Sequence, residues 1–140
     1  MLSDNGKNFS DFHSCCDNKG PTLILFHVSD GNKVGIYTPL TWDSFSQSKF
    51  DKETFLFNLN KNKKYKKIND KVSSIFCEKD HGPYCEGLGC GRSCQTMKKL
   101  VYYSYINNYF ENSKEILSSN SKNNTNYYNL LEVEIFEIIK

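Results

Sequence analysis

Short apolar runs alternate with polar clusters along most of the chain. Residues 22–28 (TLILFHV) form a compact apolar run with β-branched and aromatic side chains, and the polar cluster 29–32 follows it. Within that cluster Asp30-Gly31 favours a hairpin, because both central positions of the turn need a positive φ. Residues 33–38 (KVGIYT) are the expected return strand. We therefore predict a β-hairpin in this part of the chain.

Further short runs predict more strands. They cover residues 53–59, 63–68, 72–77, 99–106 and 130–139. The run 53–59 (ETFLFNL) alternates poorly but is short, aromatic and apolar, which is typical of a buried strand. The lysines of 63–68 indicate an exposed or edge strand, where charge blocks unwanted pairing. In the last run, apolar residues alternate with Glu132 and Glu134, which indicates a half-buried strand.

Aromatic and glycine positions refine this picture. We expect Ile24, Phe26, Phe55 and Phe57 to face the core on central strands, because their runs are dense in apolar side chains. Trp42 is the single tryptophan, and a core anchor is favoured over an exposed binding residue. A glycine within residues 33–38 has no side chain to pack, so it indicates a bulge or a close approach of another backbone.

The fold class that follows is α+β and mainly β: a two-sheet antiparallel β-sandwich with few short flanking helices. No helix of convincing length and periodicity stands out. Residues 1–11 form a polar lead-in and 12–140 a single domain, as the length of 140 residues suggests. Residues 107–129 are rich in Asn and Ser and are expected to be a flexible polar insert. The stretch 44–52 is expected to be a loop or a short helical turn.

Charge and hydropathy exclude some classes of partner. The net charge of +2 is too balanced to indicate nucleic acid binding. The basic stretch within 61–67 is best interpreted as the solvated face of a hairpin, with an anionic surface or RNA as the alternative. The first residues lack the apolar segment of a secretory signal, and no apolar run approaches the roughly 20 residues of a membrane span. A cytoplasmic location with reduced cysteines is therefore expected.

A dense cysteine segment offers candidate chemistry. Its possible zinc ligands are Cys77, His81, Cys85, Cys90 and Cys94. Zinc takes Cys and His ligands from such runs, but the spacings lack the paired two-residue knuckles of a zinc ribbon or finger. Buried, reduced cysteines are the favoured interpretation. A thiol redox switch is the alternative, and it needs a thiolate stabilised by a cation such as Arg92 or a partner thiol within reach.

No catalytic constellation is identifiable. A Cys–His pair such as Cys77 with His81 lacks an orienting third residue and an oxyanion loop. The nearby glycines form no phosphate loop, since no Gly-Lys-Ser/Thr follows. His27 lies in an apolar strand and is interpreted as a hydrogen-bonded sheet residue. We expect no catalytic residues, no cofactor and no enzymatic activity.

The order of these features resembles the TLDc domain family. The matching blocks are residues 20–26 (GPTLILF), 30–31 (DG), 34–37 (VGIY), Trp42, 53–57 (ETFLF), 74–76 (SIF), 82–84 (GPY) and 131–136 (LEVEIF). In that family a strand, a turn and a glycine-bearing strand lead to a Trp and then to a Glu-Thr/Ser-Phe-Leu-Phe strand. The resemblance covers about residues 12–138. Lys52 stands where the family has a glycine before this last strand.

The resemblance implies a fold and a class of function. The fold is two packed antiparallel sheets with flanking helices, and only about 20 residues precede Thr22, so the N-terminal part of the family domain is expected to be missing. The family includes oxidation resistance proteins, has no accepted catalytic residues or cofactor, and has members that bind the vacuolar proton pump. It therefore implies a non-catalytic protein-interaction module.

The closing strand offers the candidate partner-binding residues. Glu132 and Glu134 share one strand face if the side chains alternate with a period of two. A solvated edge is the other interpretation of this acidic stripe. The alternative function for the whole chain is a thiol redox-sensing or zinc-binding domain that uses the cysteine segment 77–94.

Overall fold

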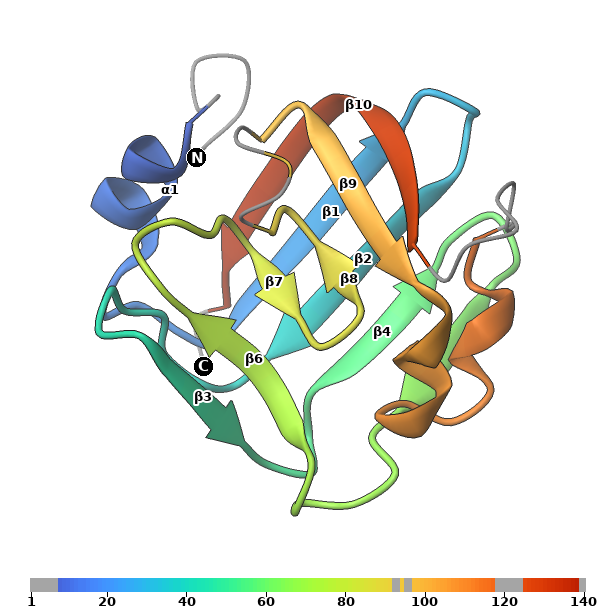
Figure 1. Ribbon diagram of the computed structural model, residues 1–140, viewed down its shortest axis with the longest axis horizontal. Helices are drawn as coiled ribbons and strands as arrows, with labels where there is room; N and C mark the ends of the chain where they lie inside the picture. Colours follow the sequence, from blue (N-terminus) through green and yellow to red (C-terminus); the bar gives the residue numbers. More distant parts are fainter. Residues whose placement is uncertain (1–7, 92–93, 95–96, 118–124, 139–140) are drawn as a thin grey trace.

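A computed structural model describes residues 8–91, 94, 97–117 and 125–138 (Figure 1). The described residues form one α-helix and ten β-strands. In chain order they are α1 (Phe9–Cys16), β1 (Thr22–Val28), β2 (Lys33–Thr38), β3 (Gln47–Phe50), β4 (Phe55–Asn58), β5 (Lys63–Lys66), β6 (Ser73–Cys77), β7 (Tyr84–Cys85), β8 (Leu88–Gly89), β9 (Lys99–Tyr103) and β10 (Thr125–Glu137). Two 3₁₀ helices, η2 (Ser104–Asn108) and η3 (Ser113–Glu115), lie between β9 and β10.

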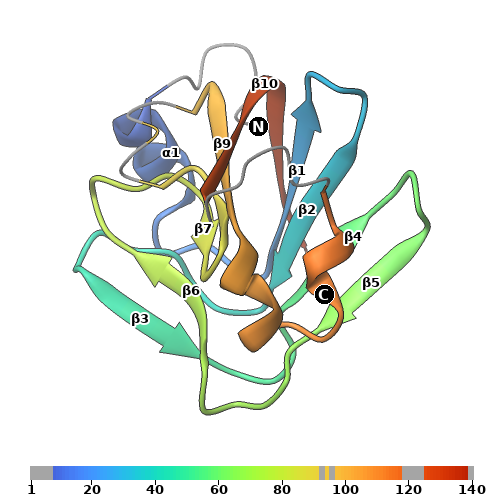
Figure 2. The same ribbon diagram turned by 45° about the vertical axis from the view of Figure 1, so that its right-hand side comes forward.

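The strands form one continuous sheet in the order β3-β6-β7-β8-β9-β10-β1-β2-β4-β5, and all neighbouring pairs are antiparallel. The mainly β prediction is confirmed. The division into two separate sheets is not confirmed, because β10 pairs with β9 along its first part and with β1 along its second part. The sheet curls around this long strand, so that β6 and β7 lie opposite β2 and β4 (Figure 2).

The concave, inner face of the curled sheet holds the main core. Along β1 every second residue is buried, and Ile24 and Phe26 are both fully enclosed, as predicted. Trp42 is also fully buried, which confirms it as a core anchor. Its indole Nε1 donates a hydrogen bond to the Thr22 hydroxyl at 2.9 Å, so the polar end of the ring is satisfied inside the core. Helix α1, the other strands from β2 to β10 except β3, and the segment 106–117 contribute further residues to this core.

Helix α1 was not predicted, because eight residues give too little periodicity to recognise. Its start carries a local signal: the Asn8 side chain accepts a hydrogen bond from the Asp11 amide at 2.8 Å, as an N-cap does. Phe12 anchors the helix in the core, with its ring edge-on to Trp42 at a centroid separation of 5.3 Å. The helix crosses the boundary expected between lead-in and domain.

The prediction that Phe55 and Phe57 face the core is wrong for Phe55, whereas Phe57 is buried, with an exposed fraction of 8%, but lies outside the main core cluster. Both pair with β2 residues of the outer face, Tyr37 and Gly35, whereas Leu56 between them is fully buried in the core. Phe55 is only half-buried and stacks on Tyr37 with ring centroids 5.1 Å apart. Three consecutive apolar residues carry no alternation, so the pattern could not decide which face points inward.

Gly35 confirms the predicted close approach of another backbone. A Cβ atom at this position would lie 2.1 Å from the carbonyl oxygen of Ile24 and 2.3 Å from Cζ of Phe57. No side chain fits between these two atoms. The ring of Phe57 therefore lies over the glycine. This contact explains why the exposed fraction of Phe57 is only 8%, although the residue is on the outer face.

Two segments differ from the sequence-based expectation. Residues 44–52, expected to be a loop or helical turn, contain the short edge strand β3. Within the segment 107–129, expected to be a polar insert, Phe110, Ile116 and Leu117 are buried in the core and β10 begins at Thr125. Residues 118–124 of that segment lie outside the described part of the chain. Among the described residues, no helix is long and apolar enough to cross a membrane.

Candidate functional site

The five candidate zinc ligands lie on the β6–β8 region and the loop that follows it. In the part of the chain that the structure describes, no three of them place ligand atoms close enough to share an ion. The thiol of Cys85 donates to the carbonyl of Leu88 at 3.2 Å, and that of Cys77 points toward the carbonyl of Thr41 at 3.9 Å. All six cysteines lie within the described residues, and none of them forms a disulfide.

Burial makes these thiols poor nucleophiles. Desolvation raises the pKa of Cys77 from its ordinary value of 9.0 to about 11. Desolvation also raises the pKa values of the Cys85 and Cys90 thiols, both of which are fully enclosed. A redox-active cysteine needs the opposite, a lowered pKa and access to solvent. Arg92, the cation considered for that role, lies outside the described residues.

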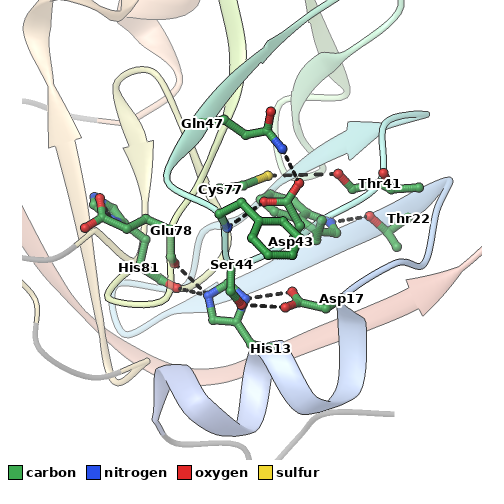
Figure 3. Close-up of polar contacts among 12 residues, drawn as sticks. His13, Asp17, Thr22, Thr41, Asp43, Ser44, Gln47, Cys77, Glu78 and His81 are labelled. Atoms are coloured by element: carbon green, nitrogen blue, oxygen red, sulfur yellow. Dashed lines mark hydrogen bonds and ion pairs between the residues drawn. The ribbon is translucent and has the colours of Figure 1, made fainter.

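A polar cluster that the sequence did not reveal joins α1 to two loops (Figure 3). His13 Nδ1 lies 2.7 Å from a carboxylate oxygen of Asp17, and its Nε2 lies 2.7 Å from the carbonyl oxygen of Glu78 and 2.8 Å from that of His81. The Ser44 hydroxyl donates to the other oxygen of Asp17 at 2.5 Å. The cluster therefore ties the helix to the loop before β3 and to the loop after β6.

This cluster has the residue types of a Ser-His-Asp triad but not its geometry. In a triad the imidazole accepts the hydroxyl proton of the serine through the nitrogen that does not face the aspartate. Here that nitrogen of His13 faces two backbone carbonyls, and Ser44 is bonded to Asp17 instead. The arrangement satisfies buried polar groups between distant segments. Because the members are up to 68 residues apart, local sequence patterns could not predict it.

The lysines of the stretch 61–67 fall into two groups. Those at 61, 63, 64 and 66 are exposed, as expected for a solvated face. Lys67 is buried, and its Nζ donates to the carbonyls of Val72 and Ser73, the latter at 2.9 Å. Burial lowers the pKa of Lys67. Lys64 lies over the ring of Phe55, with Nζ 4.2 Å from the centroid.

Beside these lysines lies an open hollow of about 390 Å³, lined by Tyr37, Lys52, Glu53, Thr54, Phe55, Lys64 and Lys66. Three lysines face one glutamate across two stacked aromatic rings. The hollow is basic and shallow.

Strand β10 carries three exposed large apolar side chains, and Leu131 is the most exposed apolar residue of the described strands. Leu131 is 74% exposed, Tyr127 52% and Phe136 42%. The pairing of β10 with β1 steps from His27↔Glu132 to Val28↔Leu130, so Leu131 is an extra, unpaired residue of a β-bulge. The bulge directs Leu131 outward beside Glu132. We call the outward residues of this strand the β10 outer surface: Tyr127, Leu131, Glu132, Glu134 and Phe136.

The structure brings Glu132 and Glu134 together with His27. His27 Nε2 lies 2.9 Å from a carboxylate oxygen of Glu134 and 4.0 Å from one of Glu132. The three side chains are partly exposed: 22% for His27, 32% for Glu132 and 33% for Glu134. The expectation that the two glutamates share one face agrees with their pairing to residues of β1 that also point outward. His27 is a hydrogen-bonded sheet residue, as interpreted from the sequence.

Comparison with known proteins gives one family. The family model described as the TLDc domain matches residues 1–139 of the chain. No curated protein matches the sequence.

Proposed function

Because the chain belongs to the TLDc domain family, we propose that it is a non-catalytic protein-interaction module, linked to protection against oxidative stress and acting on the vacuolar proton pump. The β10 outer surface is the observation that supports this function best. Leu131 and Phe136 are large apolar side chains held open to solvent on a central strand. Exposed apolar groups rimmed by charge are typical of protein-binding surfaces.

The position of this surface determines how a partner would bind. β10 pairs with β9 through residues 125–129 and with β1 through residues 130 and 132–137. We take the partner to contact the outward side chains of this strand rather than to add a strand to the sheet. Leu131 supplies the apolar centre, and the carboxylates of Glu132 and Glu134 supply a negative rim that fits a basic surface. Rim charges mainly tune association rate and salt dependence.

The test is binding of the purified chain to the purified vacuolar proton pump, measured by surface plasmon resonance. We expect saturable binding that Leu131→Asp weakens at least about tenfold. The substitution replaces an apolar side chain that the partner would bury in the complex by a charged one. Phe45→Asp is the matched control: Phe45 is 78% exposed but precedes β3, on another part of the molecule. Absence of binding, or equal loss with both variants, would contradict the assignment of this surface.

The non-catalytic part of the proposal has its own test. The buried thiols with raised pKa values give little support to the alternative of a thiol redox domain. We expect no catalytic decomposition of hydrogen peroxide by the purified chain. Turnover that disappears in Cys77→Ser would reverse the proposal in favour of redox chemistry.

A further inference from the structure

Three side chains with metal-binding groups meet on the outer face of β1 and β10. They are His27, Glu132 and Glu134, and one ligand atom from each lies within 4.8 Å of the other two. Among the described residues this is the only such group of three His, Cys, Asp or Glu side chains. Two come from β10 and one from β1, so the sheet pairing alone brings them together.

The backbone holds these side chains in place. His27 is the direct pairing partner of Glu132, and Glu134 stands diagonally, opposite Leu25. β1 and β10 are central strands, and the inward neighbours Phe26 and Val133 are packed in the core. The bulge at Leu131 sits at the end of the cluster and fixes where the pairing register changes. Only side-chain rotation is left to adjust the three groups.

Their charges favour a cation between them. Two carboxylates, each about one third exposed, lie around one imidazole. Like charges this close repel each other. Lys33 pairs with His27 from β2 and lies on the same outer face, but it brings one positive charge against two negative ones. A divalent ion would compensate the remaining negative charge, and it would take the place of the proton in the hydrogen bond between His27 Nε2 and Glu134, with that proton released to solvent.

The spacing suits a small ion. Zinc binds imidazole nitrogen at about 2.0–2.1 Å and carboxylate oxygen at about 2.0–2.2 Å in tetrahedral sites, which places neighbouring ligand atoms roughly 3.4 Å apart. The two distances from His27 Nε2, 2.9 Å and 4.0 Å, lie on either side of that value. Small rotations of the glutamates would close the site.

We propose that His27, Glu132 and Glu134 bind one divalent transition-metal ion of the zinc class, with the fourth position open to solvent. One imidazole and two carboxylates form a nitrogen–oxygen ligand set of the kind that zinc and manganese accept. The site shares Glu132 and Glu134 with the proposed β10 outer surface, but metal binding is measured on the isolated chain, so its test does not depend on the partner. The contrasting state is a simple His–Glu ion pair with no affinity for metal.

The experiment uses two probes on the purified chain. Mn²⁺ prefers oxygen and nitrogen ligands over thiolates, so it avoids the six cysteines. We expect Mn²⁺ to broaden the amide NMR signals of residues 27 and 132–134 most strongly, with the effect decreasing with distance from them. Zinc titration by calorimetry is expected to give one site that His27→Gln and Glu134→Gln each weaken at least about tenfold, since even outer-shell partners of metal ligands contribute 10–100-fold. Glu137→Gln, which removes the same charge from the same strand, is expected to leave the affinity unchanged.

Two results would overturn the proposal. One is Mn²⁺ broadening that is absent or centred elsewhere. The other is zinc affinity that is unaffected by His27→Gln, or equally reduced by Glu137→Gln, since either would show binding at thiols or a general charge effect. If the glutamine variants failed to fold, the Mn²⁺ broadening pattern of the unmodified chain would still decide. Binding to the proton pump is measured separately, so failure of one proposal leaves the other intact.

Discussion

Strands β1, β2, β4 and β10 have two faces that differ in packing. On the inner face Ile24, Ile36, Leu56 and Ile135 are almost completely enclosed. On the outer face of the same strands, side chains such as Leu131 and Phe136 remain open. Inner positions are thus specified by packing, where each methylene matters. Outer positions are free of that constraint, which leaves them available for binding.

The outer face is not open everywhere. Over β7 and β9 a second small cluster forms from Tyr84, Cys94 and Val101, against which Phe76 and Tyr103 pack. Cys94, which follows β8 in the chain, packs on the outer face at that end of the sheet. Apolar side chains are thus packed together on the outer face over β7 and β9, whereas Leu131 and Phe136 of β10 stay open to solvent.

Substitutions at two neighbouring residues of β4 test most directly whether the inner and outer faces differ in packing. Leu56→Ala is expected to cost about 2–5 kcal/mol of unfolding free energy, because it leaves a cavity in the core. Phe55→Ala on the outer face should cost less than about 1 kcal/mol, apart from the lost stacking on Tyr37. Urea unfolding of both variants measures the difference. Equal costs would abolish the distinction between the faces.

A second prediction concerns how completely water is excluded from the inner face. The pKa of Cys77 is raised from 9.0 to about 11 by desolvation, so the folded state holds the thiol proton more tightly than the unfolded state does. A raised pKa gives stability that is complete below pH 9 and is lost as pH rises through about 11. Two pKa units correspond to roughly 3 kcal/mol.

Cys77→Ala isolates this contribution from other alkaline titrations. The stability difference between the unmodified chain and this variant should shrink as the pH rises from 8 to 11, because only the unmodified chain loses the contribution of the thiol. Chemical denaturation at several pH values gives this difference. A difference that stays constant would mean that the thiol is hydrated in the folded state.

The third prediction tests the close contacts of Gly35 with the backbone of β1 and with the ring of Phe57. An alanine Cβ would meet the Ile24 backbone carbonyl, which cannot move without disturbing β1, and the ring of Phe57, which can. We expect Gly35→Ala to cost about 1–3 kcal/mol, as overpacking does. Adding Phe57→Ala should recover only the part due to the ring. Full recovery in the double variant would show that the ring, and not the backbone approach, requires the glycine.

Particular residues show what the sequence could and could not predict. The hairpin of β1 and β2 was predictable because its signals are local: a short apolar run with β-branched and aromatic residues at 22–28 and Asp30-Gly31 at the turn. The face of β4 was not, because its consecutive apolar residues have no period. The cluster of His27 with Glu132 and Glu134 depends on pairing between strands more than 100 residues apart, so no spacing rule could reveal it. The contacts of His13 with the loop after β6 also join residues far apart in the sequence, so no local pattern could predict them.

The smallest expected change in stability is at the bulge of β10. Leu131 is 74% exposed and unpaired in the ladder, so Leu131→Asp removes almost no buried area. The unfolding free energy should change by no more than about 0.5 kcal/mol, as for ordinary surface substitutions. Pump binding should fall in the same variant, because its apolar centre is lost. A large loss of stability would mean that Leu131 packs against the rest of the chain, and the outer surface would then be a second core, as it is over β7 and β9.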